Sequence, residues 1–311
     1  MSHRVVYFNG RYVAESEARI SIFDSALQLG DMAFEVTRTY HGRPFKLSEH
    51  LARLRYSMTA LSIDPGLSDE MLERITLEVL ARNRPTEPPD VDWNILHDVS
   101  RGPASAFRSF FAEADRRPTV VVACFPLAEK MAKLAPAYEV GIDLVVPEQR
   151  SLPHALFDPR VKCRSRAHYQ LANLQADARR SGASALLFDL DGFATEGTTG
   201  NVFFVRRGAL HTPTARNLLP GITRETVLDL ARRHGLEARE ADLTLADVMS
   251  CDEAFVTSTS IGILHARSIE GRPTADGALG PITRRLRDAL TDEVGLDFAE
   301  QARAYARRYA S

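Results

Sequence analysis

The order of short apolar runs is the feature that most narrows what this chain can fold into. Residues 5–8 and 11–13 flank Asn9-Gly10, a dipeptide typical of a type I′ turn, and together they predict a β-hairpin. Further strands of the same region are predicted over 33–40, 44–47, 91–100 and 119–125. The first part of the chain should therefore contain an antiparallel sheet.

Two helices are expected to lie against this sheet. The apolar residues of 48–61 recur at helical spacing, and Ser48 is a suitable N-cap for that segment. A second helix is predicted over 71–80.

A stretch at 126–137 interrupts the strand pattern and is expected to connect two unequal domains, 1–125 and 138–311. Beyond it, strands are predicted over 140–146, 185–188, 202–205 and 253–257, and helices over 165–181, 223–234 and 281–290. The expected fold class is α+β with two domains.

Composition argues against several classes of protein. The 311 residues carry a formal net charge of −2, so we expect neither a nucleic-acid nor a membrane partner. The start of the chain lacks the apolar stretch of a signal peptide, and no apolar run reaches the ~18 residues of a membrane span, so a cytoplasmic protein is expected. Cys124, Cys163 and Cys251 are far apart and form neither a disulfide framework nor a zinc site, and no metal is expected.

Lysine occurs only four times, and the other 35 of the 39 basic residues are arginine. Chemistry that needs an amine therefore has four candidates, namely Lys46, Lys130, Lys133 and Lys162. Lys162 lies within four residues of Arg160, Arg164 and Arg166. A cationic neighbourhood disfavours an ammonium ion, so this amine is suited to attack an aldehyde. The alternative is a solvated basic run.

Other segments could hold an anionic or cationic group. Glu196 precedes a run of small residues and could pair with a cationic ring nitrogen, or it could be a turn residue. The segment 220–224 precedes an amphipathic helix whose N-terminal amides could bind phosphate, or it could be a plain helix cap. The hydroxyl-rich turn 257–260 could also donate to an anion, and Arg53 could supply counter-charge or be an exposed helix residue.

The order of these motifs is more specific than any one of them. They are Gly30-Asp-Met-Ala-Phe-Glu35, Glu49-His-Leu-Ala-Arg-Leu54, Lys162, the run from Asp191 to Phe203, Leu219-Pro-Gly-Ile-Thr-Arg224 and the run from Asp252 to Thr259. In this succession the chain resembles the class IV aminotransferases, the pyridoxal-phosphate (PLP) fold-type IV family. The resemblance extends from about residue 5 to about residue 290. It implies a small N-terminal α/β sandwich, a larger β-barrel-like domain with helices, and a homodimer whose active sites lie between domains.

The resemblance also implies roles for individual residues. Lys162 matches the lysine that forms a Schiff base with PLP and moves the proton, and Glu196 matches the carboxylate on the pyridine nitrogen. Tyr169 is the candidate for the cofactor's 3′ oxygen, although it follows the lysine at a longer spacing than usual. The phosphate cup is matched by Arg53, Ile222, Thr223 and Thr259.

The substrate-side motifs fit no familiar subgroup of this family. Ala106 and Arg108 stand where relatives specific for D-amino acids have an Arg-x-His pair, and 163–166 reads Cys-Arg-Ser-Arg where small residues and Asn are usual. The substrate-binding candidates are Arg38, Arg101, Arg108 and Ser260, with Arg164 and Arg166 as further carboxylate readers.

The expected function is transfer of an amino group between an amino acid, branched-chain or otherwise small and apolar, and a 2-oxo acid by a ping-pong cycle. The alternatives are a D-amino acid aminotransferase or amine transaminase, a lyase of the aminodeoxychorismate kind, and a PLP-binding protein without turnover.

Overall fold

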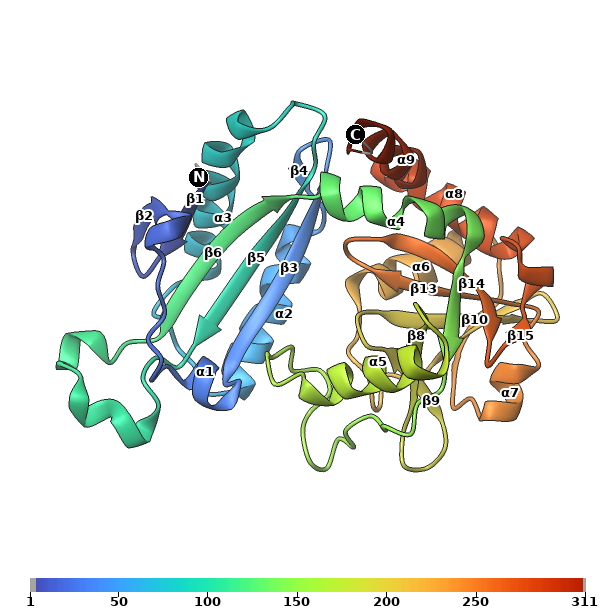
Figure 1. Ribbon diagram of the computed structural model, residues 1–311, viewed down its shortest axis with the longest axis horizontal. Coiled ribbons are helices and arrows are strands. Elements are labelled where there is room, and N and C mark those ends of the chain that lie inside the picture. The colour runs from blue at the N-terminus through green and yellow to red at the C-terminus, as the bar shows by residue number, and fades with distance from the viewer. Residues whose placement is uncertain (1–3, 310–311) are drawn as a thin grey trace. The chain divides into compact units, whose positions relative to one another are not determined.

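The computed structural model describes residues 4–309 and divides into two compact units (Figure 1). Unit 1 comprises Met1–Leu127 together with Val161–Arg166, and unit 2 comprises Ala128–Arg160 and Ala167–Ser311. The short segment that carries Lys162 therefore belongs with the N-terminal unit, although it lies far along the sequence.

Unit 1 is built on a six-stranded antiparallel sheet of strand order β2-β1-β6-β5-β3-β4. The strands are β1 (Val5–Phe8), β2 (Arg11–Ala14), β3 (Met32–Tyr40), β4 (Arg43–Pro44), β5 (Trp93–Ser100) and β6 (Thr119–Pro126). Helices α2 (Leu47–Ala60) and α3 (Asp69–Asn83) pack on each other and on the sheet (Figure 1). A short helix α1 (Ser25–Leu29) precedes β3, and 3-10 turns occupy Glu15–Glu17, Arg84–Thr86, Ser105–Phe110 and Glu113–Asp115. The predicted arrangement of two helices against an antiparallel sheet is confirmed.

The first hairpin forms as predicted, with positive φ at both Asn9 (47°) and Gly10 (90°), as a type I′ turn requires. The predicted N-cap of α2 is wrong. The helix begins at Leu47 after Lys46, which lies in the left-handed region, and Ser48 is inside its first turn. The return strand β4 is only two residues long, so the chain has already turned into the helix where a longer strand was expected.

Unit 2 contains a mixed sheet in the order β12-β11-β10-β13-β14-β7-β8-β9, with β15 paired to β14. The strands are β7 (Ile142–Val145), β8 (Ser184–Phe188), β9 (Ala194–Gly197), β10 (Asn201–Arg206), β11 (Ala209–Pro213), β12 (Ala238–Ala241), β13 (Glu253–Ser258), β14 (Gly262–Ile269) and β15 (Arg272–Pro273). Strand β9 at one end of this order contacts β10 and β11 near the other end. The sheet is thus curled, in agreement with the predicted barrel-like domain.

The helices of unit 2 cover this sheet, and the first of them lies in the segment that was predicted as an interdomain connection. They are α4 (Ala128–Val140), α5 (Ala167–Arg179), α6 (Ile222–Arg233), α7 (Leu245–Met249), α8 (Pro281–Val294) and α9 (Phe298–Tyr309), with a 3-10 turn at Ala275–Gly277. The segment 126–137, predicted as an interdomain connection, is mostly helix α4, which packs on α9. Its buried residues Ala128, Met131, Ala135 and Tyr138 recur at helical spacing and supply the packing stripe.

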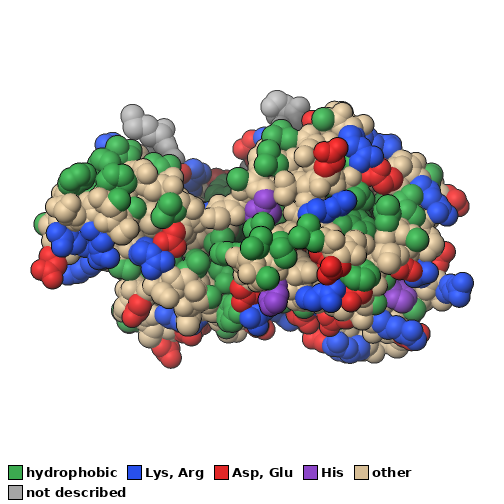
Figure 2. Space-filling model, turned by 90° about the horizontal axis from the view of Figure 1, so that it is seen from below, with side chains coloured by type: hydrophobic (Ala, Val, Ile, Leu, Met, Phe, Trp, Pro, Cys, Tyr) green, Lys and Arg blue, Asp and Glu red, His purple; other side chains and the backbone are tan. Residues whose placement is uncertain are grey.

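Charges of both signs are mixed over the face of the molecule drawn in Figure 2. This mixture accords with the net charge of −2. In the range 4–309, no helix is long and apolar enough to span a membrane.

Strand β14 of unit 2 carries a buried histidine. His265 on β14 is 1% exposed, and neither of its ring nitrogens has a hydrogen-bond partner within residues 4–309. Burial, with smaller contributions from the charges of Arg287 and Arg284, lowers the pKa of His265 from 6.5 to about 4. The folded protein thus holds this imidazole neutral at physiological pH.

We expect His265→Leu to make folding less sensitive to acid. The unfolded chain takes up a proton near pH 6.5 while the folded chain does not, so stability is lost as pH falls from 6.5 towards 4. Between pH 7 and 5.5 this one group should remove about 1 kcal/mol, and the variant should lack that loss. Urea unfolding at the two pH values measures it, with the exposed His234→Gln as the control. An equal acid sensitivity of wild type and His265→Leu would refute the prediction.

Candidate active site

Lys162 is held beside the edge of the sheet of unit 1. The backbone N–H of Phe34 donates to the carbonyl of Lys162 (3.0 Å), and the N–H of Arg164 donates to the carbonyl of Met32 (2.9 Å). The N–H of Lys162 itself donates to Oγ of Ser57 on α2 (3.0 Å). Segment 161–166 therefore extends the sheet locally at the start of β3, which fixes the backbone from which Lys162 projects.

Three cationic side chains gather around the ring of Phe34, which is 6% exposed. Nζ of Lys162 lies 4.6 Å from the ring centroid, and the guanidinium carbons of Arg164 and Arg166 lie 4.0 and 5.7 Å from it. Arg164 also makes a two-pronged ion pair with Asp98 (2.8 and 3.0 Å). The basic run is therefore a cluster on a buried aromatic ring, at which an anionic ligand is favoured.

Arg53, expected to face a phosphate, is paired with Glu35. Its Nε and Nη2 donate to the two carboxylate oxygens of Glu35, each at 2.8 Å, and Nδ1 of His50 lies 3.1 Å from Oε1. Burial alone would raise the pKa of Glu35, but the Arg53 charge and the hydrogen bonds from His50 and Arg53 hold that pKa well below 4.5. Burial lowers the pKa of His50, and the charges of Arg53 and Lys162 act in the same direction. Sequence reasoning missed this network, although both Glu35 and His50 lie within the motifs that carried the resemblance.

The other arginines predicted on the substrate side have separate surroundings in unit 1. Arg38 is fully buried on β3, with its guanidinium carbon 4.4 Å from the ring centroid of Tyr40. Arg101 pairs with Asp31 (2.7 Å) and also donates to two backbone carbonyls of a turn after α2. Arg108 is exposed in the 3-10 turn after β5 and donates to a backbone carbonyl.

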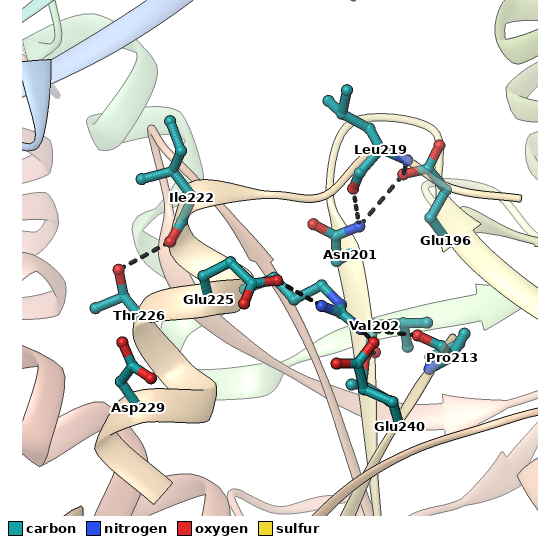
Figure 3. A network of polar contacts seen from close by, with 12 residues as sticks. Glu196, Asn201, Val202, Pro213, Leu219, Ile222, Glu225, Thr226, Asp229 and Glu240 are labelled. Atoms are coloured by element: carbon teal, nitrogen blue, oxygen red, sulfur yellow. Dashed lines mark hydrogen bonds and ion pairs between the residues drawn. The ribbon is translucent and has the colours of Figure 1, made fainter. Parts of the chain in front are cut away.

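Glu196 lies on strand β9 of unit 2 and is not a turn residue, which was one of the two alternatives. Glu196 is 5% exposed, and its carboxylate accepts hydrogen bonds from residues of unit 2, of which Asn201 and Leu219 are labelled in Figure 3. The donors are the hydroxyl of Tyr169 (2.6 Å), Nδ2 of Asn201 (3.3 Å) and the N–H of Leu219 (3.2 Å). Pairing of β9 with β8 places the glutamate on a rigid element.

The N-terminus of α6 is close to the same carboxylate. Helix α6 begins at Ile222 after Gly221, and no side chain caps it. The first N–H groups of a helix have no acceptors within the helix, so those of Ile222 and Thr223 are available to an anion. A Cβ on Gly221 would lie 2.0 Å from Oδ1 of Asn201, so only glycine allows this approach. Asn201 thus connects Glu196 to the start of α6 (Figure 3).

Arg224 fixes the first turn of α6 from behind. It is 1% exposed, and its Nη2 donates to the carbonyl of Pro213 (2.9 Å) and to Glu240 (2.7 Å). The Arg of the Leu-Pro-Gly-Ile-Thr-Arg motif therefore has a structural explanation, independent of any ligand.

The hydroxyl-rich turn after β13 adds further donors. Thr259 and Ser260 lie in this turn, and Thr257 at the end of β13 is 1% exposed with an Oγ1 that has no hydrogen-bond partner within residues 4–309. Thr257 is directly opposite Asn201 on β10, so their side chains share one face of the sheet. Sequence reasoning named Thr257 only as part of the turn. A ligand with a phosphate at one end and a cationic ring nitrogen at the other would fit these groups. The phosphate would be bound by the Thr257 hydroxyl and the start of α6, and the ring nitrogen would pair with the carboxylate of Glu196.

No group of three or more His, Cys, Asp or Glu residues suited to a metal ion occurs in the described part of the chain. The candidate ligand-binding groups of unit 2 are instead a carboxylate, backbone amides and hydroxyls.

Comparison with known proteins defines the class. The family model of class IV aminotransferases matches residues 32–269, and the chain belongs to this family. It is 34% identical to a putative branched-chain-amino-acid aminotransferase of Methanocaldococcus jannaschii, over 92% of this chain and 95% of that protein. It is also 30% identical to the D-alanine aminotransferase of Bacillus licheniformis, over 93% and 96%.

Solved structures agree. The branched-chain amino acid aminotransferase of Escherichia coli superposes with a TM-score of 0.81 at 27% identity, covering 94% of both chains. The branched-chain aminotransferase of Thermoproteus uzoniensis with norvaline gives 0.81 at 26% identity, covering 94% of this chain and 95% of the other. The predicted family, fold type and transaminase activity are confirmed.

Proposed function

We propose that the chain uses pyridoxal phosphate, held covalently by Lys162, to move an amino group from a branched-chain or other small apolar amino acid to a 2-oxo acid. The observation that supports this most directly is the buried Glu196 with three donors, next to the uncapped start of α6. When bound, the cofactor supplies a ring that withdraws electrons from the substrate Cα. Two solved structures of a similar branched-chain amino acid aminotransferase carry pyridoxamine 5′-phosphate and a phosphopyridoxyl derivative of glutamate, in accordance with this assignment.

Each residue has a distinct task in this proposal. Lys162 holds the cofactor and then takes and returns the proton at Cα. Glu196 keeps the ring nitrogen protonated. The phosphate is bound by the N–H groups of Ile222 and Thr223, by the hydroxyl of Thr259 and by the charge of Arg53.

The substrate side of the proposal rests on Ser260, which lies in the same turn as Thr259. Arg38, Arg101 and Arg108 remain candidates for the substrate carboxylate. Because Arg101 already pairs with Asp31 and two carbonyls, it would have to exchange protein partners for substrate.

A homodimer is part of the proposal. Apolar side chains of unit 1 are exposed around the ring of Phe23, which lies 4.9 Å from that of Phe107 and 6.1 Å from that of Phe110. Phe110 is 71% exposed, and Leu29 is 69% exposed. A surface of this kind is typical of protein contacts, and a second copy of the chain is the partner we propose for it. A cytoplasmic location is proposed as well, since all three cysteines are free and buried.

A half-reaction screen tests the function. The cofactor-loaded enzyme is mixed with single L- and D-amino acids and amines, without an oxo-acid acceptor, and the visible absorbance of the cofactor is followed. We expect L-leucine, L-isoleucine and L-valine to bleach it, with release of one equivalent of the matching 2-oxo acid. Bleaching only by D-amino acids or amines would indicate the alternative donors. Repeated release of pyruvate would indicate a lyase, and no change with any amine would indicate binding without turnover.

A further inference from the structure

We propose that Tyr169 is a positioning residue that acts through Glu196 and does not bind the 3′ oxygen of the cofactor. This inference rests on the proposed function. It departs from the role that the family resemblance implied for Tyr169. The observation behind it is the hydroxyl of Tyr169, which donates to Oε1 of Glu196 at 2.6 Å.

The three donors divide between the two oxygens of the carboxylate. Tyr169 donates to Oε1, while Asn201 and Leu219 both donate to Oε2, at 3.3 and 3.2 Å. The bond from Tyr169 is the shortest, and hydrogen bonds to an ionised acceptor are stronger than neutral ones. Of these three donors, Tyr169 therefore contributes most to fixing the orientation of Glu196.

The three donors also come from three different elements. Tyr169 is on α5, Asn201 is on β10, and Leu219 precedes α6. A carboxylate held from three directions keeps one orientation, and donors to a carboxylate favour its charged form. Such a group is prepared to receive a protonated ring nitrogen without rearrangement.

Packing limits the freedom of Tyr169 to turn elsewhere. Its ring packs against a buried cluster of unit 2 that includes Ala172, Ala176 and Leu187, and the ring of His168 lies 4.1 Å away. The tyrosine sits in the first turn of α5, seven residues after Lys162, so its direction is set by the contact of α5 with β7 and β8. The longer spacing noted in the sequence thus places the hydroxyl at the nitrogen side of the proposed cofactor site.

A double-mutant cycle tests the inference, with Tyr169→Phe, Glu196→Ala and the double variant, because alanine leaves no acceptor for the Tyr169 hydroxyl. Two quantities are measured on each protein: the dissociation constant of pyridoxal phosphate, and the pH dependence of the visible absorbance of the bound cofactor. In the wild-type background, Tyr169→Phe should weaken cofactor binding by about tenfold. In the Glu196→Ala background Tyr169→Phe should have almost no further effect, because the side chain through which Tyr169 acts is already absent.

If the two substitutions raised the dissociation constant by factors that multiply in the double variant, Tyr169 would contact the cofactor directly. That result would overturn the inference. An unchanged dissociation constant in Tyr169→Phe would overturn it as well. The control is Tyr138→Phe, which removes a 2.7 Å hydrogen bond from another buried tyrosine of unit 2 to the carbonyl of Ile261. It should leave both readouts unchanged. Failure of the proposed function would be recognised separately, by attachment of the cofactor to a lysine other than Lys162.

Discussion

Lys162→Ala is expected to reduce transamination by more than about a thousandfold, the largest loss of any single substitution in this chain. The amine both holds the cofactor and moves the proton at Cα, so no neighbouring group can take over either task. The arginines at the Phe34 ring cannot substitute, because a guanidinium does not lose its proton in proteins. The rate of oxo-acid formation with L-leucine and excess cofactor is the measurement.

Lys133→Ala is the matched control for this variant. Lys133 is an exposed lysine on α4 that pairs with Glu129 one helical turn away, and its removal should leave the rate within about twofold of wild type. A Lys162→Ala protein that still turned over at a comparable rate would contradict the account.

Glu196→Gln is expected to lower the rate by about a hundredfold or more. The amide is nearly the same size and can still accept from Tyr169, so the fold should persist. It carries no charge, however, and cannot keep a ring nitrogen protonated. The measurement is the single-turnover rate of bleaching with L-leucine. It is made at saturating cofactor, so that a weaker affinity for the cofactor does not affect the rate.

The control for that variant is Glu293→Gln, which changes a surface glutamate paired with Arg233 and should have no effect. If Glu196→Gln lost only cofactor affinity and kept its single-turnover rate, Glu196 would be a binding residue without the proposed electrostatic role.

Much of the fold could be predicted because local patterns agree with it. The Asn9-Gly10 turn requires two positive φ values, and the strands and helices of unit 1 show clear periodicity. Strand β14 was not predicted, since buried polar residues such as His265 and Ser268 interrupt its apolar pattern. The segment of helix α4 was read as a connection because it interrupts the strand pattern, and its packing on α9 is a long-range contact that this pattern does not specify.

The site could be predicted only in part, for a physical reason. Lys162 and Glu196 lie in short motifs whose residues are adjacent in sequence. The pairing of Arg53 with Glu35, and of Tyr169 with Glu196, joins residues that are 18 and 27 positions apart. Such contacts depend on how helices pack on strands, and no local pattern specifies them.

Identification of the lysine that holds the cofactor tests the central claim most directly. The enzyme is loaded with pyridoxal phosphate, reduced with borohydride to fix the cofactor to its amine, digested and mapped by mass spectrometry. The account predicts a single modified residue, Lys162, and loss of the label in Lys162→Ala. Label on Lys46, Lys130 or Lys133, with Lys162 unmodified, would contradict it.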